Sequence, residues 1–377
     1  MKFMGVKWLF LAFILLLLGL SSCASTQYYW QAANGHMGML LKAKPIDEVL
    51  KDPKTPETLK QLLALSVEAR KFASQQLLLP DNASYTRYAD LNQKAVVWNV
   101  VAAPQLSLQA KTWCFWIAGC VSYKGFYSLE AAQQQAKELE ALGYEVKTYP
   151  VPAYSSLGWS NLLGGDPILN TFIYYPDQEL ISLIFHELAH QKVYAPDDSA
   201  FNESFATAVE KIGWQQWQSQ TANLTNANTV AENQIADTEK NAIRRQKRDQ
   251  FKQLTRHTRQ QLLAIYKAYE EQKISKDLAL AQKAQAMLEF KTAYLQFKQQ
   301  WQGDSSFDTW AFSLNNAALL SDATYDIWVD AFIYLYQQNN NWPIFYKEVQ
   351  ALANLSFQDR QAKLKQLNQV AKTKISH

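Results

Sequence analysis

The stretch Ile184-Phe185-His186-Glu187-Leu188-Ala189-His190 holds two histidines four residues apart, with a glutamate directly after the first. We expect it to lie on a helix over residues 178–193. At 100° per residue, positions four apart project from one face of a helix, so His186 and His190 can bind one metal ion. Zinc is the expected ion, and Glu187 is then placed beside a zinc-bound water whose proton it can take. The pattern therefore predicts a zinc site that activates water.

A catalytic zinc needs a third protein ligand and one open position. An extended motif with a third histidine would need glycine at position 193 and histidine at 196, but the chain has Val193 and Pro196, which excludes the metzincins. A second helix is expected from about Asn202 to Gln218. Its stretch Phe201-Asn202-Glu203-Ser204-Phe205-Ala206-Thr207-Ala208-Val209-Glu210 resembles the second-helix motif of gluzincins.

This resemblance implies that Glu203 is the third zinc ligand, although only twelve residues separate it from His190, fewer than in thermolysin-like enzymes. Asp197 and Asp198 are the alternatives, since some zincins use an aspartate. Glu210, two turns after Glu203 on the same face, is either a partner of a zinc-bound histidine, a group that binds the substrate amine, or a surface carboxylate.

Two further roles have weaker candidates. An aminopeptidase must hold the α-ammonium group of its substrate, for which Asp166 is a candidate beside Glu210, although an aspartate before proline is also a common turn former. An oxyanion needs a donor besides zinc, and zincins commonly supply one from a later segment. Tyr325 is the expected donor, with Tyr154 and Tyr123 as alternatives.

The composition of the whole chain favours a large helical core. Of 377 residues, 48% are hydrophobic, whereas only 12 are glycine and 11 are proline, which makes a turn-rich all-β fold improbable. The net charge is +3, and it falls to 3 − 2 = +1 if a leader containing Lys2 and Lys7 is removed. A nearly neutral chain gives no electrostatic case for binding nucleic acid.

The N-terminus has the pattern of a bacterial lipoprotein signal. Lys2 and Lys7 precede an apolar run from Trp8 to Leu20, and small residues precede Cys23. The resemblance to a lipobox implies cleavage before Cys23 and lipid on its thiol. Because Ala24 rather than aspartate follows, the usual sorting rule favours the outer membrane, with the chain facing the periplasm. An uncleaved anchor or an ordinary signal peptide is the alternative.

The remaining cysteines, Cys114 and Cys120, have five residues between them. In an oxidising envelope we expect a disulfide. Two metal ligands are the alternative, but no histidine lies within sixty positions.

The pattern along the chain predicts an α+β fold that is mostly helical, with a small sheet and a long helical hairpin. Expected strands include residues 95–101, 119–127, 144–151 and 168–175, and Ser128 is expected to cap a helix that ends at Gly143. We divide the chain into a leader (residues 1–22), a zincin-like catalytic region (23–232), a hairpin insertion (233–302) and a C-terminal helical part (303–377).

Several segments together resemble a bacterial family of predicted aminopeptidases, a group of lipoprotein zincins. The matching segments are Ala73 to Asp90, Trp98 to Pro104, Gly119 to Tyr127, Ala153 to Trp159, Phe185 to Gln191, Phe201 to Glu210, Asn315-Asn316-Ala317 and Phe345-Tyr346. The resemblance implies a membrane-anchored peptidase with one zinc ion and a peptide substrate. It leaves the oligomeric state, the choice between exo- and endopeptidase and the role of the hairpin open. The alternative function is a non-catalytic envelope lipoprotein whose zinc is structural and which acts as a scaffold.

Overall fold

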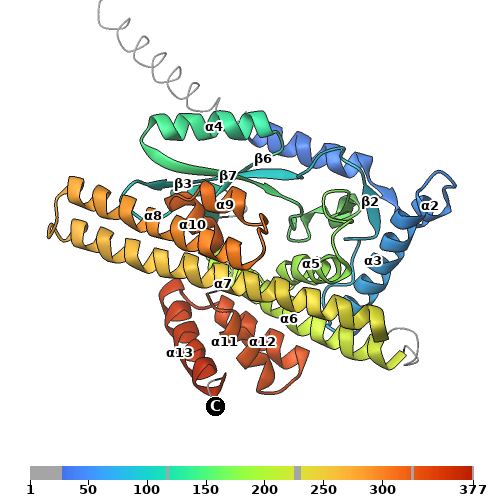
Figure 1. The fold of residues 1–377 in the computed structure, drawn as a ribbon. Coiled ribbons are helices and arrows are strands. Elements are labelled where there is room, and N and C mark those ends of the chain that lie inside the picture. Colours follow the sequence, from blue (N-terminus) through green and yellow to red (C-terminus); the bar gives the residue numbers. More distant parts are fainter. Residues whose placement is uncertain (1–27, 116–118, 225–230, 324–326, 376–377) are drawn as a thin grey trace, which may run out of the picture.

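The computed structural model describes residues 28–115, 119–224, 231–323 and 327–375. The predicted lipid attachment site Cys23 and the predicted donor Tyr325 lie outside these ranges. The described chain is mostly helical with small sheets, which agrees with the predicted α+β class (Figure 1). Within those ranges, we find no helix with both the length and the apolar character that crossing a membrane requires.

The N-terminal part consists of three helices and a small sheet. A helix over residues 28–42 is followed by β1 (Lys44–Pro45), α2 (Ile46–Lys51), α3 (Glu57–Gln75) and β2 (Arg87–Ala89). Strand β2 is antiparallel to β1 and parallel to β8 (Ile168–Leu169). This small sheet joins the segment that follows the helix over residues 28–42 to the segment that leads into the histidine helix.

The second sheet has β3 (Val97–Pro104) at its centre. It pairs antiparallel with β7 (Tyr144–Val151) over eight residues and with the edge strand β6 (Lys124–Phe126). Helix α4 (Leu129–Ala141) packs against β7 and β3, and α10 (Asn316–Ala323) also contacts both strands; Figure 1 shows the two helices on opposite faces of the sheet. Ser128 caps α4, since its Oγ accepts a hydrogen bond from the backbone nitrogen of Ala131 at 3.2 Å.

A short hairpin joins β4 (Trp113–Phe115) to β5 (Gly119–Val121). Cys114 and Cys120 face each other in its register and are joined by a disulfide. The disulfide therefore closes a small local loop between two adjacent strands.

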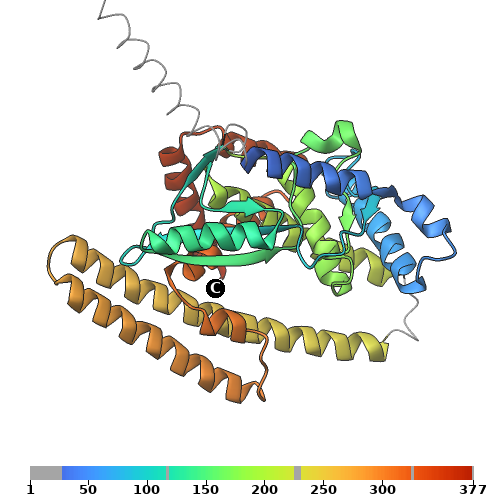
Figure 2. The same cartoon turned by 90° about the horizontal axis from the view of Figure 1, so that it is seen from above.

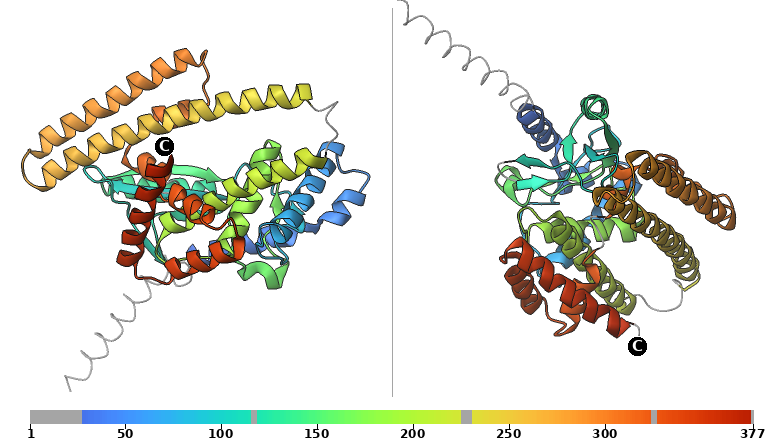
Figure 3. Two further views of the ribbon diagram at one scale, coloured as in Figure 1. Left: turned by 90° about the horizontal axis from the view of Figure 1, so that it is seen from below. Right: turned by 90° about the vertical axis from the view of Figure 1, so that its left-hand side faces the viewer.

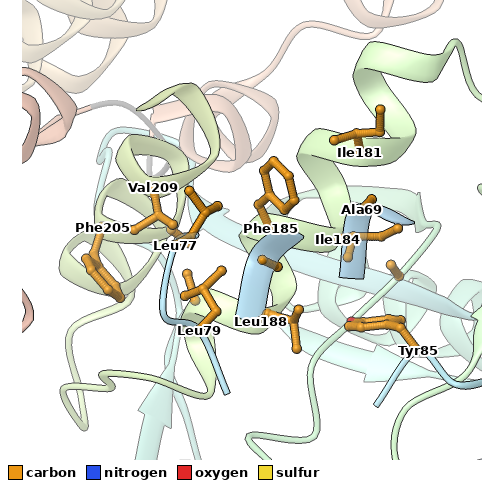
Figure 4. Close-up of a cluster of buried hydrophobic side chains, with 14 of the residues drawn as sticks. Ala69, Leu77, Leu79, Tyr85, Ile181, Ile184, Phe185, Leu188, Phe205 and Val209 are labelled. Atoms are coloured by element: carbon orange, nitrogen blue, oxygen red, sulfur yellow. The ribbon is translucent and has the colours of Figure 1, made fainter. Parts of the chain in front are cut away.

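The largest hydrophobic core surrounds α5 (Asp177–His190), which packs between α3 and α6 (Ser199–Leu224). Figure 4 shows Ile181, Ile184, Phe185 and Leu188 of α5 meeting side chains from α3, from the segment after it and from α6. Their spacing of three and four residues forms one buried stripe. The opposite stripe of α5 is left for polar residues.

From α6 onward, the described residues form helices that are joined by short segments without regular secondary structure. Two long antiparallel helices lie side by side along one edge of the molecule (Figures 2 and 3). They and the later helices are α7 (Ala231–Glu270), α8 (Lys276–Gln300), α9 (Asp308–Phe312), α11 (Val329–Gln337), α12 (Trp342–Ala353) and α13 (Phe357–Ile375). A small core including Leu262, Ala286 and Leu319 attaches this pair to α10. The division of the chain into separate units remains a prediction.

One predicted strand is wrong in most of its length. Only Ile168–Leu169 pairs as a strand, and residues 171–175 form turns. The backbone nitrogens of Phe172 and Ile173 both donate to the carbonyl of Leu169, so the chain folds back on itself there. A short apolar run is compatible with a strand or a buried turn, and periodicity does not distinguish them. The predicted strand over residues 119–127 is likewise divided into β5 and β6.

Candidate metal centre

Helix α5 carries the two histidines and the glutamate on the side opposite its core stripe. The helix begins after Pro176 and ends at His190, close to the predicted limits. His186, Glu187 and His190 line a large cavity, and Gln178, Glu179, Ser182 and Leu183 continue that lining along the same side of the helix. One helix thus separates a packed core from a cavity.

The imidazoles of His186 and His190 meet the carboxylate of Glu203 from α6. Their two Nε2 atoms lie 3.2 Å apart, and Oε2 of Glu203 lies 3.3 Å from Nε2 of His186 and 3.7 Å from Nε2 of His190. The three ligand atoms all lie within 4.8 Å of one another.

These separations fit a tetrahedral metal ion. Two donors that each lie about 2.05 Å from a tetrahedral zinc are separated by about 3.3 Å. The observed separations lie near this value, and the donor set of two imidazoles and one carboxylate is one that zinc accepts. The structure therefore brings together three residues that could hold one metal ion.

Asp197 and Asp198, the alternative ligands, have other partners. Oδ1 of Asp197 accepts a hydrogen bond from the backbone nitrogen of Cys120 at 2.6 Å. This close approach requires glycine at position 119, where φ is +71° and a Cβ would lie 2.3 Å from the same oxygen. Asp198 is buried, and its carboxylate accepts from the backbone nitrogen of Phe201 and from the guanidinium of Arg360. Of the three acidic candidates, Glu203 is the one that lies with the histidines.

Asn202 explains how a short connection can bring Glu203 to the histidines. Its side chain accepts from the backbone nitrogen of Ala195 and donates to the carbonyl of the same residue, both at 2.8 Å. Asn202 is buried, so these two bonds satisfy backbone groups that have no access to water. They hold the loop close to α6, and Glu203 follows directly in the chain.

Glu210 is not among the possible metal ligands but contacts one of them, His186. Its Oε2 is 3.2 Å from Nδ1 of His186, the ring nitrogen that does not face His190 and Glu203. A carboxylate at this position accepts a hydrogen bond from Nδ1–H, fixes the orientation of the ring and leaves the lone pair of Nε2 free to bind a metal ion. The placement corresponds to the first of the three roles considered for Glu210.

The charges around the histidines favour a cation. Burial by itself lowers the pKa of His186, but its hydrogen bonds with Glu203 and Glu210 outweigh this effect and hold the pKa well above its usual range. Burial lowers the pKa of His190 to about 4. Burial also opposes ionisation of Glu203, yet the nearby imidazoles hold the pKa of its carboxyl below the usual value. The ionised carboxylate of Glu203 and the neutral ring of His190 are therefore in the protonation states that a metal ion needs, whereas His186 has to give up a proton to bind one.

Glu187 is buried beside this cluster. Burial raises the pKa of its carboxyl to about 7, the neighbouring His186 opposes this change, and the charges of Glu203, Asp166 and Glu210 add to it. No hydrogen bond from the part of the chain that the structure describes reaches its carboxylate. Its oxygens are thus available to a molecule in the cavity, with a pKa suited to proton transfer near neutral pH.

The cavity in front of the cluster has a volume of about 1080 Å³. Its walls come from α5, from α6, from the face of β3, from the edge strand β6 and from the helix over residues 28–42. Most of the lining is apolar and aromatic. The cationic side chains among the described lining residues, apart from the histidines, are Arg244 and Arg248 of α7. The space is large enough for several residues of a peptide.

The tyrosines considered as oxyanion donors differ in position. Tyr123 lines the cavity, and the pKa of its phenol is raised by burial first and then by the charge of Glu203. Tyr154 also lines it, but its hydroxyl is engaged with His36 and Tyr127. Tyr194 lines the cavity as well and was not selected from the sequence, because a single tyrosine in a loop has no pattern that marks it.

Asp166 lies in a network of loop hydrogen bonds. Its carboxylate accepts from the backbone nitrogen of Ser156 at 3.0 Å and from the hydroxyl of Ser160 at 2.7 Å. The residue is buried and is not part of the cavity lining. The carboxylate of Asp166 therefore ties two loop segments together, and its contact with a substrate amine stays a prediction.

Comparison with known proteins identifies one related family. A family model described as "Putative aminopeptidase" matches residues 27–364, which is nearly the whole chain and includes every residue of the candidate metal centre. No protein of curated function and no solved structure matches the chain.

Proposed function

Since the chain belongs to the Putative aminopeptidase family, we propose that it is a zinc-dependent peptidase whose metal ligands are His186, His190 and Glu203. The observation that carries the proposal is the convergence of these three donor atoms at separations that fit a tetrahedral ion, beside a buried carboxylate without a hydrogen-bond partner among the described residues. Helices α5 and α6 would then be the metal-binding helix pair of a zincin.

A bound zinc would lower the pKa of a water molecule and polarise the scissile carbonyl. Glu187 takes the proton from the attacking water and delivers it to the leaving amine, a role that its pKa of about 7 supports. Glu210 holds the ring of His186 through Nδ1. Tyr123 lines the cavity close enough for the charge of Glu203 to act on its phenol and is our candidate donor among the described tyrosines, whereas Tyr325 lies outside the described residues.

A structural zinc site, the basis of the scaffold alternative, usually has four protein ligands and needs no base. This cluster offers three ligands and faces a cavity of about 1080 Å³. These features support catalysis over a purely structural role. The lipid anchor on Cys23, the removal of residues 1–22 and the outer-membrane location are part of the same proposal and rest on the sequence alone.

The test is to purify residues 24–377, load the protein with zinc and incubate it with a complex peptide mixture. The cleavage products are compared by mass spectrometry with those of Glu187→Gln, which should keep the metal because Glu187 is not a ligand. Metal content and circular dichroism of both proteins provide the control.

Stepwise loss of N-terminal residues by the wild type alone would establish an aminopeptidase that uses Glu187. Internal cuts by the wild type alone would keep the zinc mechanism and replace the exopeptidase assignment. Identical product profiles from two proteins that both contain zinc would overturn the proposal in favour of the scaffold.

A further inference from the structure

Large apolar side chains are exposed on two neighbouring elements. In the short 3-10 helix η1 (Trp159–Leu163), Leu162 is 97% exposed, Trp159 is 70% exposed and Leu163 is about half exposed. In the helix over residues 28–42, Leu41 is 78% exposed and Trp30 is 68% exposed. A soluble surface rarely gathers tryptophan and leucine side chains in this way unless something covers them.

The exposed residues of the helix form one stripe. Trp30, Met37 and Leu41 are seven and four residues apart, so they project from the same side. The opposite side of the helix faces the interior of the protein, because Tyr28 and Ala32 line the cavity of the candidate metal centre. No aspartate, glutamate, lysine or arginine occurs from residue 28 to residue 41.

Arg87 links the two elements. Its guanidinium donates to the carbonyl of Leu163 at 3.2 Å and to the carbonyl of Leu40 at 3.3 Å, and it also donates to the carbonyl of Ala43. The end of η1 and the end of the N-terminal helix therefore lie next to each other. The exposed apolar side chains of these two adjoining elements are Trp30, Met37, Leu41, Trp159, Leu162 and Leu163, and we refer to them together as the apolar surface.

This surface lies on the side of the molecule opposite the long hairpin. In the view from above, the helix over residues 28–42 runs along one edge and the pair α7 and α8 runs along the other (Figure 2). A flat partner that covers the apolar surface would leave the hairpin on the far side of the molecule, lying roughly along the partner's plane.

The chain that precedes the helix indicates what this partner is. Only residues 24–27 separate Cys23 from Tyr28. Five Cα–Cα steps span at most about 18 Å, so a lipid on Cys23 holds the start of the helix near the bilayer. Tryptophan is favoured at the membrane interface, and the exposed Lys42 and Lys44 next to Leu41 suit anionic headgroups.

We propose that the apolar surface formed by Trp30, Met37, Leu41, Trp159, Leu162 and Leu163 docks on the phospholipid bilayer, with its side chains in the headgroup region. The inference rests on the proposed lipid anchor and is independent of peptidase activity. Docking fixes the orientation of the molecule, because one wall of the metal-site cavity belongs to the same helix and the hairpin lies on the side away from the membrane.

The experiment uses the full-length lipidated chain in vesicles of phosphatidylethanolamine and phosphatidylglycerol that contain a nitroxide-labelled lipid. A bimane fluorophore is attached to Leu162→Cys or to Leu41→Cys, so that each half of the surface is tested. The matched control is Leu288→Cys, since Leu288 of α8 is 58% exposed on the hairpin. Cys114 and Cys120 form a disulfide and do not react.

Interfacial residues lie about 5–10 Å deep, so the nitroxide should quench bimane at positions 162 and 41 at least about twofold more than at position 288. Equal quenching at all three positions on vesicle-bound protein would overturn the inference. So would failure of the chain to float with vesicles. Shielding of the position 162 label without vesicles, together with a dimer in size-exclusion chromatography, would replace the bilayer with a second copy of the chain.

Discussion

Arg360 of α13 places Nη1 2.9 Å from Oδ2 of Asp198, and both side chains are almost completely buried. The other oxygen of Asp198 accepts from the backbone nitrogen of Phe201, in the first turn of α6. The C-terminal helix thus holds the start of the helix that carries Glu203. Arg360 also donates to the carbonyls of Leu352 and Ala353, so its charge is well compensated.

Removing one partner of this buried pair should destabilise the protein strongly. Arg360→Leu leaves the carboxylate of Asp198 buried without its counter-ion, and we expect the free energy of unfolding to fall by about 3–5 kcal/mol. Urea denaturation measures the change. In the double variant Asp198→Asn/Arg360→Leu the loss should be smaller than the sum of the two single losses. A loss below about 1 kcal/mol for Arg360→Leu, the range of an exposed pair, would contradict this role.

The choice of third metal ligand can be tested with a matched pair of variants. Glu203→Gln removes the carboxylate that lies 3.3 Å from Nε2 of His186, and we expect zinc affinity to fall by more than about 100-fold, beyond the effect of losing an outer partner. Asp197→Asn keeps an oxygen that can accept from the nitrogen of Cys120, so zinc affinity should not change. Competition with a chromogenic chelator measures both. The reverse ranking would move the ligand to Asp197.

Glu210 should act on the metal through His186. Glu210→Gln removes the carboxylate at Nδ1 without changing the shape of the side chain, and we expect zinc affinity to fall about 10- to 100-fold. Glu179→Gln is the control, because this carboxylate lines the same cavity but is not within reach of the imidazoles. Isothermal titration compares the two variants. Equal affinities would return Glu210 to a surface role or to substrate binding.

Zinc binding should weaken as the pH falls. In the metal-free protein, burial lowers the pKa of His186, but Glu203 and Glu210 hold the pKa well above its usual range, so a proton occupies the ring over a wider pH range. Zinc must displace this proton, and affinity should fall about tenfold for each pH unit below the pKa. Chelator competition from about pH 8 to about pH 6 measures the slope. In Glu210→Gln the pKa of His186 falls, so the decline should begin at lower pH. A flat profile in the wild type would contradict the prediction.

Local patterns in the sequence determined the helix of the metal centre, because its side-chain directions follow from residue spacing alone. The positions of His186 and Glu187 relative to each other on α5 needed no other information. The roles of Asp197 and Asp198 could not be predicted, since their partners Cys120 and Arg360 lie far away in the sequence. The role of Glu210 could not be chosen from the sequence, because its contact with His186 depends on how α5 and α6 pack against each other.

Among the predicted strands, the long ones were predicted correctly and the short apolar segment after Leu169 was not. The pairing of β3 with β7 involves two long strands with clear β-forming residues, and both strands were predicted. Residues 171–175 form turns, with Phe172 and Ile173 buried, because hydrogen bonds to the carbonyls of Leu169 and Phe172 satisfy backbone nitrogens without a partner strand. The apolar run therefore did not determine the conformation of this segment.

The oxyanion donor can be assigned by comparing three tyrosines. Tyr123 lines the cavity, and burial together with the charge of Glu203 raises the pKa of its phenol, so that it stays protonated and can donate a hydrogen bond. We expect Tyr123→Phe to lower kcat by about 10²- to 10³-fold with little change in KM and with zinc still bound. Tyr154→Phe should have a smaller effect on kcat, because that hydroxyl bonds to His36 and Tyr127. Steady-state kinetics on the peptide identified in the cleavage screen, with metal content as control, measures each variant. A large loss in Tyr325→Phe with none in Tyr123→Phe would assign the role to Tyr325.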